Sequence, residues 1–519
     1  MTAEQQGTVY LIGSGPGDPG LLTVKGKELL SRADVVIYDY LANPHFLEWT
    51  REGAELIYVG KKGGDHTMSQ DRINRLIVEK AREGKSVVRL KGGDPFIFGR
   101  GGEEAEKLAR AGVDFEVVPG VTSAISVPAY AGIPLTHRDY TPTVAFVTGH
   151  EDPLKERSGI AWDKLATGVG TLVFLMGVGN LAHIADRLMK HGRPGSTPVA
   201  VIRRGTTAEQ STWLGTLQDI GRIAEENRIR PPAIIVVGEV VQLRQALNWF
   251  ETKPLFGRRI VVTRAREQAS EFRQVLDSLG AETIEFPTIE VKPPENWDAL
   301  DRAIREIDAY DWLLFTSVNG VRFFLERLGT LGKDVRDLKG IQIGVIGPKT
   351  AEMWQRLGIR PDLMPEEYRA EAVVDALKAG GVNGLRILIP RAAKAREVLP
   401  ERLREAGARV DVVHAYQTLT PDHDAGRVRE LLSKGSIDMV TFTSSSTVSN
   451  FVKMFRGAED RLGEWMAQVA VACIGPITAQ TARENGLSVS LIPPAYTIDS
   501  LTREITRFFG SQVPESEPE

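Results

Sequence analysis

Residues 87–104 read VVRLKGGDPFIFGRGGEE, and this stretch decides the fold class predicted for the N-terminal half of the chain. The run Val87–Leu90 is typical of a buried strand, and it ends in a glycine-rich turn, where an open α/β sheet lets a ligand approach the backbone. Arg100 and Glu103 are three residues apart, so they would share one face of a helix that begins here. A cation and a carboxylate are therefore predicted beside a glycine-lined pocket. The alternative is that Glu103 and Glu104 only complement the helix dipole in its first turn.

A second glycine-rich turn, GSGPGDPGLLT at residues 13–23, follows the apolar run Val9–Ile12. It differs from the dinucleotide-binding fingerprint, because Pro16 lies inside the turn and Asp18 stands where the third glycine of G-x-G-x-x-G falls. It also lacks the Gly-Lys-Ser/Thr ending of a phosphate-binding loop. The turn therefore predicts a ligand-binding loop without pyrophosphate chemistry, or else only a tight connection between a strand and a helix.

The composition is that of a globular protein, with 519 residues, 42% hydrophobic and 25% charged. This length fits about three or four domains. The net charge of −4 argues against nucleic-acid binding, for which a basic domain is expected. The single cysteine, Cys473, lies among apolar residues, which excludes a disulfide framework within one chain and indicates a buried thiol.

Neither a metal site nor a membrane segment is predicted. The eight histidines have no ligand spacing, and His137 and His150 are as well explained by packing as by substrate contact. No apolar run reaches the roughly 18 residues that span a bilayer, and the N-terminus MTAEQQG does not resemble a signal peptide. We therefore expect a cytoplasmic protein without membrane partners.

Strands alternate with helical stretches through residues 9–241, which is the pattern of α/β layers. Residues 140–149 are predicted to cross into a second lobe. Its strands are predicted at Val144–Thr148, Thr171–Met176, Pro198–Ile202 and Ala233–Val237. A new strand is expected at Arg259–Thr263, so the main boundary is placed just before it. The predicted organisation is a domain at 1–250, with lobes of about 7–140 and 141–250, a linker at 251–257, a domain at 258–510 and a disordered acidic tail at 511–519.

The C-terminal half contains an internal repeat. GRRIVVTRA at residues 257–265 parallels GLRILIPRA at 384–392, YDWLLFTS from Tyr310 parallels IDMVTFTS from Ile437, and IGVIGP from Ile343 parallels VACIGP from Val471. Two copies of one α/β unit predict two similar lobes with a cleft between them. Several repeated strands end in hydroxyl or glycine residues, which suit anionic ligands at helix N-termini, although helix capping explains the hydroxyls equally well.

Six motifs in the first half carry a resemblance to a known family. They are GSGPGDPGLLT, YDYL at 38–41, VGKKGGDHTMSQ at 59–70, the 87–104 stretch, PGVTSA at 119–124 and AYAGIPLTHRDY at 129–140, followed by FLMG at 174–177 and PPAIIVVGEVV at 231–241. In this order they resemble uroporphyrinogen-III C-methyltransferase over residues 7–250. The resemblance implies a two-lobed tetrapyrrole-methylase fold, a homodimer, and S-adenosyl-L-methionine as methyl donor for C2 and C7 of uroporphyrinogen III, giving precorrin-2. One departure is Arg203-Arg204-Gly205-Thr206, where the family usually has Glu-Asn-Gly-Thr.

The resemblance also implies roles for individual residues. Glu103 would be the base and Arg100 would orient the substrate, while Asp39, Lys61 and Met176 match positions tied to activity. Without the resemblance, Asp39 is equally a helix cap and Met176 a core residue. The implied cofactor contacts are Pro16, Gly92, Gly93, Asp94, Ile97, Thr122, Ser123, Met176, Gly205 and Ala233. Cationic anchors for the carboxylate-rich substrate are sought among Lys61, Lys91, Arg89, Arg100 and Arg138, for each of which surface solvation is the alternative.

The second half resembles uroporphyrinogen-III synthase over residues 257–510, through VVTRA, FTSVNGV, AYQT at 415–418, FTSSSTV and IGPITA. This implies two flavodoxin-like α/β lobes joined by a two-stranded linker. Lobe one would hold residues 258–292 and 418–510, and lobe two residues 293–416. Tyr416 matches the family tyrosine suspected of assisting departure of the substrate hydroxyl, although a packing role is equally compatible. The expected substrate contacts are Thr263, Arg264, Ser317, Lys349, Ser444 and Thr478.

The two resemblances predict one bifunctional α/β enzyme, because the synthase product is the methyltransferase substrate. It would cyclise hydroxymethylbilane with inversion of ring D and then methylate the product, for siroheme or cobalamin synthesis. The methyltransferase motifs begin at Gly13 without a preceding dehydrogenase and ferrochelatase module, so precorrin-2 is the expected end product. Two alternatives remain: a non-catalytic tetrapyrrole-binding C-terminal module, and methylation of a later corrin intermediate by the first half.

Overall fold

The chain forms two compact units in a computed structural model. The structure describes residues 6–60, 68–150, 159–264, 266–367, 370–393, 397–421, 425–455 and 459–510. The first unit contains Met1–Arg259, Leu276–Glu282 and Phe509–Glu519, and the second contains Ile260–Val275 and Thr283–Phe508. The predicted linker at 251–257 therefore lies close to the end of the first long segment. The predicted tail at 511–519 lies outside the described residues.

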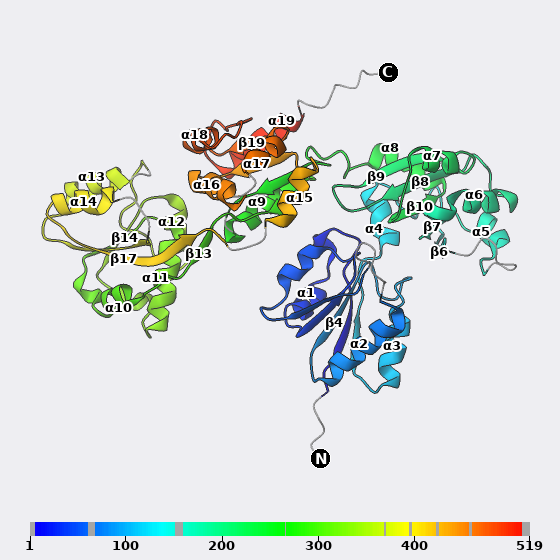
Figure 1. The fold of residues 1–519 in the computed structure, drawn as a ribbon, viewed down its shortest axis with the longest axis horizontal. Coiled ribbons are helices and arrows are strands. Elements are labelled where there is room, and N and C mark those ends of the chain that lie inside the picture. Colours follow the sequence, from blue (N-terminus) through cyan, green and yellow to red (C-terminus); the bar gives the residue numbers. More distant parts are fainter. Residues whose placement is uncertain are drawn as a thin grey trace, which may run out of the picture. The chain divides into compact units, whose positions relative to one another are not determined.

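A parallel five-stranded sheet forms the first lobe of the first unit, in the order β3-β2-β4-β1-β5. Its strands are β1 (Val9–Gly13), β2 (Val35–Tyr38), β3 (Glu55–Tyr58), β4 (Val87–Lys91) and β5 (Phe115–Val118). Helix α1 (Val24–Leu30) covers one face, and α2 (Gln70–Arg82) and α3 (Gly101–Arg110) cover the other (Figure 1). Strand β4 is buried along its whole length because it lies in the middle of the sheet. The sheet therefore reads in sequence as apolar runs rather than as an alternating pattern.

Helix α4 (Ser123–Tyr130) leads to the second lobe of this unit. Its sheet has the order β6-β7-β10-β8-β9 and mixed directions, since β6 and β7 are parallel whereas β10 is antiparallel to both β7 and β8. Its elements are β6 (Val144–Thr148), α5 (Trp162–Gly168), β7 (Thr171–Leu175), α6 (Leu181–Lys190), β8 (Pro198–Arg203), β9 (Ser211–Thr216), α7 (Ile220–Glu226), β10 (Ala233–Val237) and α8 (Arg244–Leu247). The four predicted strands are confirmed to within one residue, and β9 is an additional edge strand. Its side chains are only partly buried, so it lacks a continuous apolar signal.

Two further sheets follow β11 (Arg259–Val262), with orders β12-β11-β18-β19 and β13-β17-β16-β14-β15. Their other strands are β12 (Glu282–Glu285), β13 (Glu290–Lys292), β14 (Trp312–Phe315), β15 (Gln342–Val345), β16 (Arg386–Ala392), β17 (Arg409–Leu419), β18 (Met439–Phe442) and β19 (Ala470–Cys473). The helices are α9 (Arg266–Ser278), α10 (Asp298–Arg305), α11 (Val318–Thr330), α12 (Pro348–Gln355), α13 (Ala370–Gly380), α14 (Val398–Glu405), α15 (Gly426–Ser433), α16 (Ser445–Met454), α17 (Glu459–Met466), α18 (Pro476–Glu484) and α19 (Ile498–Gly510).

The internal repeat is confirmed by the positions of its strands in these two sheets. The repeated sequences form β11 and β16, β18 and β14, and β19 and β15, and the two sheets align as β12-β11-β18-β19 and β17-β16-β14-β15. Chain order within β15-β14-β16-β17 is 2-1-3-4, which is the flavodoxin-like order. The repeat therefore matches strands by place in the sheet and not by order along the chain.

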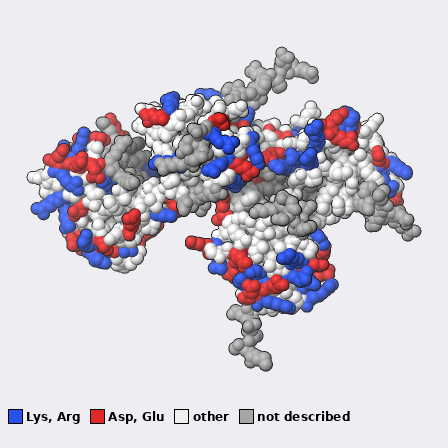
Figure 2. Space-filling model, in the orientation of Figure 1, with Lys and Arg blue, Asp and Glu red and all other residues white. Residues whose placement is uncertain are grey.

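Strand β13 pairs antiparallel with the end of β17, with Glu290 opposite Leu419 and Lys292 opposite Gln417. These residues lie where the two-stranded linker is predicted, and their role as the connection between lobes stays a prediction. Within the part of the chain that the structure describes, no helix is long and apolar enough to span a bilayer. Basic and acidic side chains are interspersed on the face drawn in Figure 2, in keeping with the small net charge of −4.

Candidate functional site

The ends of β1 and β4 form a topological switch point in the first sheet. These strands are neighbours, but the chain leaves β1 through α1 toward β2 and leaves β4 through α3 toward β5, on opposite faces (Figure 1). Open α/β sheets bind ligands at such a point, outside the carboxyl ends of the strands. Both glycine-rich turns of the sequence are therefore brought to the place where a ligand is expected.

Glycines allow the two turns to touch. Gly15 and Gly93 exchange backbone hydrogen bonds, with N···O distances of 3.2 Å from Gly15 N and 2.7 Å from Gly93 N. A Cβ atom on Gly120 would lie 2.3 Å from the Gly93 oxygen and 2.6 Å from the Gly13 Cα. Any larger residue would push the turns apart, so the glycines are required by this close approach and not by flexibility alone.

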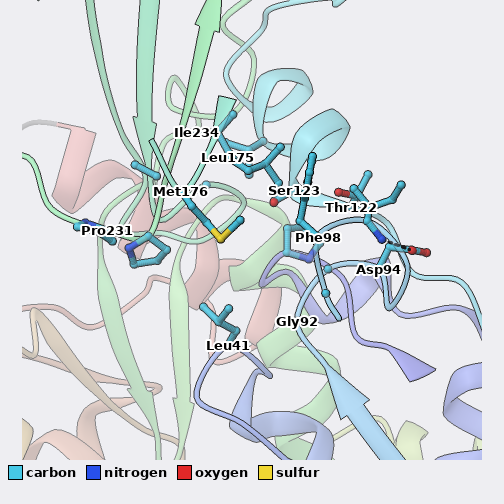
Figure 3. Close-up of a pocket in the computed structure, with 18 of the residues that line it drawn as sticks. Leu41, Gly92, Asp94, Phe98, Thr122, Ser123, Leu175, Met176, Pro231 and Ile234 are labelled. Carbon is cyan, nitrogen blue, oxygen red and sulfur yellow. Dashed lines mark hydrogen bonds between the residues drawn. The ribbon is translucent and has the colours of Figure 1, made fainter. Parts of the chain in front are cut away.

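A cavity of about 370 Å³ opens at this point, between the two lobes of the first unit. Polar loop residues Gly92, Asp94, Thr122 and Ser123 lie on one side of it. Phe98 lies beside them, whereas Met176 lies on the other side with apolar side chains that include Leu41 and Pro231 (Figure 3). The volume falls within the range of small-molecule sites, and the combination of apolar walls with a few polar groups is typical of them.

Backbone strain is concentrated around the same cavity. Within the described residues, six non-glycine residues have a positive φ, and four of them line the cavity: Phe98, Arg100, Met176 and Arg204. Such conformations cost about 1–3 kcal/mol each and persist where the surrounding structure over-determines them, which is common at functional sites. Met176 has a φ of 57° although its side chain is largely exposed, so burial of that side chain does not explain its conformation.

Asp18, the residue that breaks the dinucleotide fingerprint, ties the turn after β1 to the second lobe. Its backbone N–H donates to Thr206 Oγ1 at 3.2 Å, and its carboxylate accepts from the Tyr130 hydroxyl at 2.6 Å. Burial and the adjacent Asp18 carboxylate raise the pKa of Tyr130, so its hydroxyl keeps its proton as donor. Asp18 thus fixes one wall of the cavity and does not act as a phosphate-binding turn residue.

Next to the cavity, β4 and α3 share a buried cluster of charges. Arg89, Lys91 and Glu104 are 3%, 4% and 1% exposed. Glu104 Oε1 accepts hydrogen bonds from Arg89 Nε at 3.3 Å, Lys91 Nζ at 3.0 Å and Gln70 Nε2 at 3.0 Å. Arg89 Nη2 also donates to Asp39 Oδ2 at 3.0 Å, and both Asp39 and Lys91 line the cavity. Glu104 therefore does much more than complement the dipole of α3.

Arg100 and Glu103 form a bidentate ion pair at the start of α3, as their spacing predicts. Arg100 Nε and Nη2 donate to the two carboxylate oxygens of Glu103 at 2.8 and 2.7 Å. This hydrogen bonding lowers the pKa of Glu103 and raises the pKa of Arg100. Arg100 lines the cavity, whereas the half-exposed Glu103 is not among the lining residues. Arg100 is therefore placed to contact a ligand in the cavity, as the resemblance implies, whereas Glu103, the implied base, is not.

The residues present fit S-adenosylmethionine. All ten implied cofactor residues line the cavity. Asp94 braces the loop through its two oxygens, which accept from the N–H groups of Phe96, Ile97 and Gly120 at 2.8, 3.1 and 3.0 Å. Gly93 has a φ of 68° and leaves open the space beside the Ser123 N–H. Within the described residues, no three His, Cys, Asp or Glu side chains are grouped as metal ligands.

Some cavity residues were not selected from the sequence, and one predicted residue cannot be placed. Tyr40, Leu41, Phe98, Val127, Pro231 and Pro232 also line the cavity. All of them except Val127 lie inside the YDYL, 87–104 and PPAIIVVGEVV motifs, so assigning every residue of those motifs to the ligand site would have found them. Lys61 lies outside the described residues. Among the other proposed anchors, Arg138 does not line the cavity, and Arg89 is buried and bound to protein groups.

In the second unit, Tyr416 of β17 lies at the end of the sheet where β14 and β16 finish. Its hydroxyl is 3.0 Å from Ser317 Oγ, and its ring stacks on Phe323 with centroids 5.9 Å apart. Ser317 is also the N-cap of α11, since its Oγ accepts from the Gly320 N–H at 3.1 Å. Both readings of Ser317 therefore hold at once, because one hydroxyl caps a helix and contacts the candidate acid.

Ser444 is the repeat partner of Ser317 and has no hydrogen bond to a tyrosine in the part of the chain that the structure describes. It caps α16 in a capping box with Thr447, and its Oγ lies 2.9 Å from Ser446 Oγ. Thr478, at the start of α18, is buried. The Tyr416–Ser317 pair is thus a feature of one of the two repeated sheets.

Three further residues predicted to contact substrate in the second unit have other partners in the structure. Thr263 is fully buried and donates to the Thr441 carbonyl at 2.8 Å. Lys349 is exposed and pairs with Glu352 at 3.4 Å. Burial lowers the pKa of Arg264. Contacts of these residues with substrate stay predictions.

Comparisons with known proteins agree with this division of the chain. The family described as Tetrapyrrole (Corrin/Porphyrin) Methylases matches residues 8–221, and Uroporphyrinogen-III synthase HemD matches residues 270–503. Porphyrin biosynthesis protein HemD of Ruminiclostridium josui is 37% identical over 98% of this chain and 99% of its own length. An S-adenosyl-L-methionine-dependent uroporphyrinogen III methyltransferase of Methanosarcina barkeri is 58% identical over 47% of this chain and 95% of its length. A solved uroporphyrin III C-methyltransferase of Thermus thermophilus is 40% identical and covers 46% of this chain and 94% of its own, with a TM-score of 0.39.

Two α/β enzyme modules therefore follow each other in one chain, a tetrapyrrole methylase and a uroporphyrinogen-III synthase. The chain belongs to the family of fused uroporphyrinogen-III C-methyltransferases and uroporphyrinogen-III synthases of porphyrin biosynthesis.

Proposed function

We propose that this protein converts hydroxymethylbilane into precorrin-2 in two steps. The second unit closes the linear tetrapyrrole with inversion of ring D, and the first unit methylates the resulting uroporphyrinogen III at C2 and C7. The observation that carries this proposal is the order of two matched enzyme families in one chain, shared with a relative that it matches along 99% of that relative's length. The product of one module is the substrate of the other.

We propose S-adenosylmethionine as the methyl donor, as the name of the Methanosarcina relative states for that protein. When bound, it supplies a methyl group on a positively charged sulfur. The chain holds it through the turns after β1 and β4 and through the apolar wall that includes Met176 and Ile234. Positioning of the reacting carbon against this wall accounts for much of the rate, because a bound pair avoids the entropy cost of encounter.

Asp39 is the proton acceptor that the geometry favours. It lines the cavity, and its Oδ2 is oriented by Arg89 Nη2 at 3.0 Å while its Oδ1 accepts from the Leu41 N–H at 3.1 Å. A carboxylate at the cavity wall can take a pyrrole proton directly. Glu103 is less suited to this role, because it does not line the cavity.

In the second unit Tyr416 assists departure of the substrate hydroxyl. Its hydroxyl is oriented by Ser317 and its ring is fixed by Phe323, so it is a positioned proton donor at a strand end. Loss of the hydroxyl leaves an azafulvenium cation, which the lobes must fold into the inverted spiro geometry before it closes unaided.

The test is a product assay on the purified full-length protein with hydroxymethylbilane, with and without S-adenosylmethionine. We expect type III uroporphyrinogen without the cofactor and a dimethylated dihydro product with it, resolved by isomer after oxidation. Type I isomer alone would contradict the synthase activity and leave a tetrapyrrole-binding module in its place. Type III product that is never methylated would contradict the methyltransferase activity.

A further inference from the structure

Burying the charge cluster beside the cavity costs desolvation free energy, so the cluster needs an explanation other than stability. Arg89, Lys91 and Glu104 are each more than nine-tenths buried. Charges removed from water in this way cost several kcal/mol each, and apolar residues of similar volume often stabilise a fold as well or better. Glu104 Oε2 is also buried without a hydrogen-bond partner in the described part of the chain. The cluster is therefore poorly suited to be only a core support.

The two cations of the cluster are used differently. Arg89 donates from its Nε to Glu104, from Nη2 to Asp39 and from Nη1 to two backbone carbonyls, so its guanidinium is committed to the protein. The Lys91 ammonium has three N–H groups, and its contact with the protein is the single hydrogen bond to Glu104 Oε1 at 3.0 Å within the described residues. Lys91 also lines the cavity, immediately before the Gly92–Asp94 turn.

We propose that Lys91 is an anion-binding residue of the cavity, that it takes a carboxylate of the bound ligand, and that Glu104 is the positioning residue that holds its ammonium in place. This inference rests on the proposed function for the identity of the ligands. The carboxylate has two sources, the amino-acid end of the cofactor and an acid side chain of the tetrapyrrole.

The electrostatic surroundings of Lys91 explain why it needs Glu104. Burial and the neighbouring Arg89 lower the pKa of Lys91, whereas Glu104 and, more weakly, Asp39 raise it. Lys91 in turn contributes to lowering the pKa of Glu103, the half-exposed carboxyl at the start of α3. Without Glu104 the ammonium would lose its nearest counter-charge and its hydrogen-bond partner, so it would be both less protonated and less well placed.

The test measures binding, not turnover, by calorimetry on the full-length protein. Three probes separate the sources: S-adenosylhomocysteine, 5′-methylthioadenosine, which lacks the amino-acid carboxylate, and uroporphyrin III. We expect K91M to weaken the binding of either S-adenosylhomocysteine or uroporphyrin III by about tenfold or more, and to leave the binding of 5′-methylthioadenosine unchanged. Weakening of the first probe assigns the carboxylate to the cofactor, and weakening of the third assigns it to the tetrapyrrole. Unchanged affinity for both carboxylate probes would overturn the proposal.

A double-mutant cycle tests whether Glu104 acts through Lys91. E104Q should weaken the same probe as K91M in the wild-type background and have no further effect in the K91M background. An equal loss in both backgrounds would mean that Glu104 acts only as a structural support. The matched control is E106Q, which changes an exposed carboxylate of the same helix that pairs with Arg110 at 3.0 Å, and no affinity should change.

Two further comparisons keep the result decisive. The double variant K91M/E104Q leaves no unpaired charge of this pair, so it is measured if a single variant fails to fold. Two quantities are determined on the double variant: the ratio of its affinities for S-adenosylhomocysteine and 5′-methylthioadenosine, and its affinity for uroporphyrin III. At least one must fall by the same factor, and if neither changes the proposal fails. Wild-type protein that binds neither S-adenosylhomocysteine nor uroporphyrin III would refute the proposed function itself, independently of any variant.

Discussion

The two units present different chemistry at equivalent places in their sheets, the carboxyl ends of central strands. In the first unit Arg89 and Lys91 of β4 form a cluster of buried charges with Glu104 of α3, beside a cavity. In the second unit the neutral hydroxyl groups of Ser317, which follows β14, and Tyr416, which is level with the end of β16, lie beside an aromatic stack. In the proposed function the charges hold and deprotonate a ligand, whereas the hydroxyls assist the departure of a leaving group. The difference matches methyl transfer in one unit and ring closure in the other.

The largest expected effect distinguishes Asp39, which lines the cavity, from Glu103, which pairs with Arg100 outside it. D39N should lower methylation of uroporphyrinogen III by about a hundredfold or more, because it removes the proposed proton acceptor. E103Q should have a much smaller effect, since Glu103 lies off the cavity. Synthase activity is the internal control and should be the same in both variants. A larger loss in E103Q than in D39N would return the base to Glu103.

The roles of Tyr416 and Ser317 are tested by comparing variants at equivalent positions of the two repeated sheets. Y416F should lower formation of type III uroporphyrinogen by about tenfold or more, since it removes the proposed proton donor. S317A should lower it less, and S444A should lower it least, because Ser444 has no tyrosine partner among the described residues. Both serine variants lose a helix N-cap and should lose about 0.5–2 kcal/mol of unfolding free energy. Equal synthase losses in S317A and S444A would show that capping alone explains Ser317.

A smaller effect is expected of Lys91 on the pH dependence of the protein's unfolding free energy. Burial lowers the pKa of folded Lys91, so between that pKa and its unfolded value the unfolded chain binds more protons. Unfolding free energy should therefore rise with pH relative to K91M, by at most about 1.4 kcal/mol per pH unit. Urea unfolding of both proteins at pH 8 and pH 10 measures this difference. A parallel pH dependence in the two proteins would mean that Lys91 titrates as an exposed lysine.

The smallest effect concerns the second unit and is a probe of its folding. Cys473 is fully buried at the end of β19, and burial raises the pKa of its thiol to about 12. Native protein should therefore resist alkylation at pH 8, and label should enter only at denaturant concentrations that unfold this sheet. Rapid labelling of the native protein would contradict the packing of this strand.

Several site residues could be predicted from the sequence because they belong to contiguous motifs. Gly92, Gly93 and Asp94 follow an apolar run directly, and a strand that ends in glycines restricts where a ligand can approach. The spacing of Arg100 and Glu103 predicted that they would lie on one side of a helix start, and in the structure they form an ion pair there. The strands of the second lobe were predicted for the same reason, since each is a short apolar run between turns.

Other features were not visible in any one segment. Glu104 looked like one of two helix-dipole residues, and only the packing of α3 on β4 showed that it accepts from Lys91 and Arg89. Asp18 looked like a broken fingerprint, and only the second lobe supplied Tyr130 and Thr206 as its partners. Thr263 ended a repeated strand like a ligand residue, yet its hydroxyl is used by a neighbouring strand.

The sequence by itself determined the two modules, their order, the repeat in the second and the loops that approach a ligand. These depend on local patterns, since apolar runs, glycines and motif order act over a few residues at a time. The tertiary structure alone decided which carboxylate faces the cavity, which cation is committed to the protein and which serine meets Tyr416. Those outcomes depend on burial and on contacts between strands far apart in sequence, where the cost of removing a charge or a hydroxyl from water selects its partner.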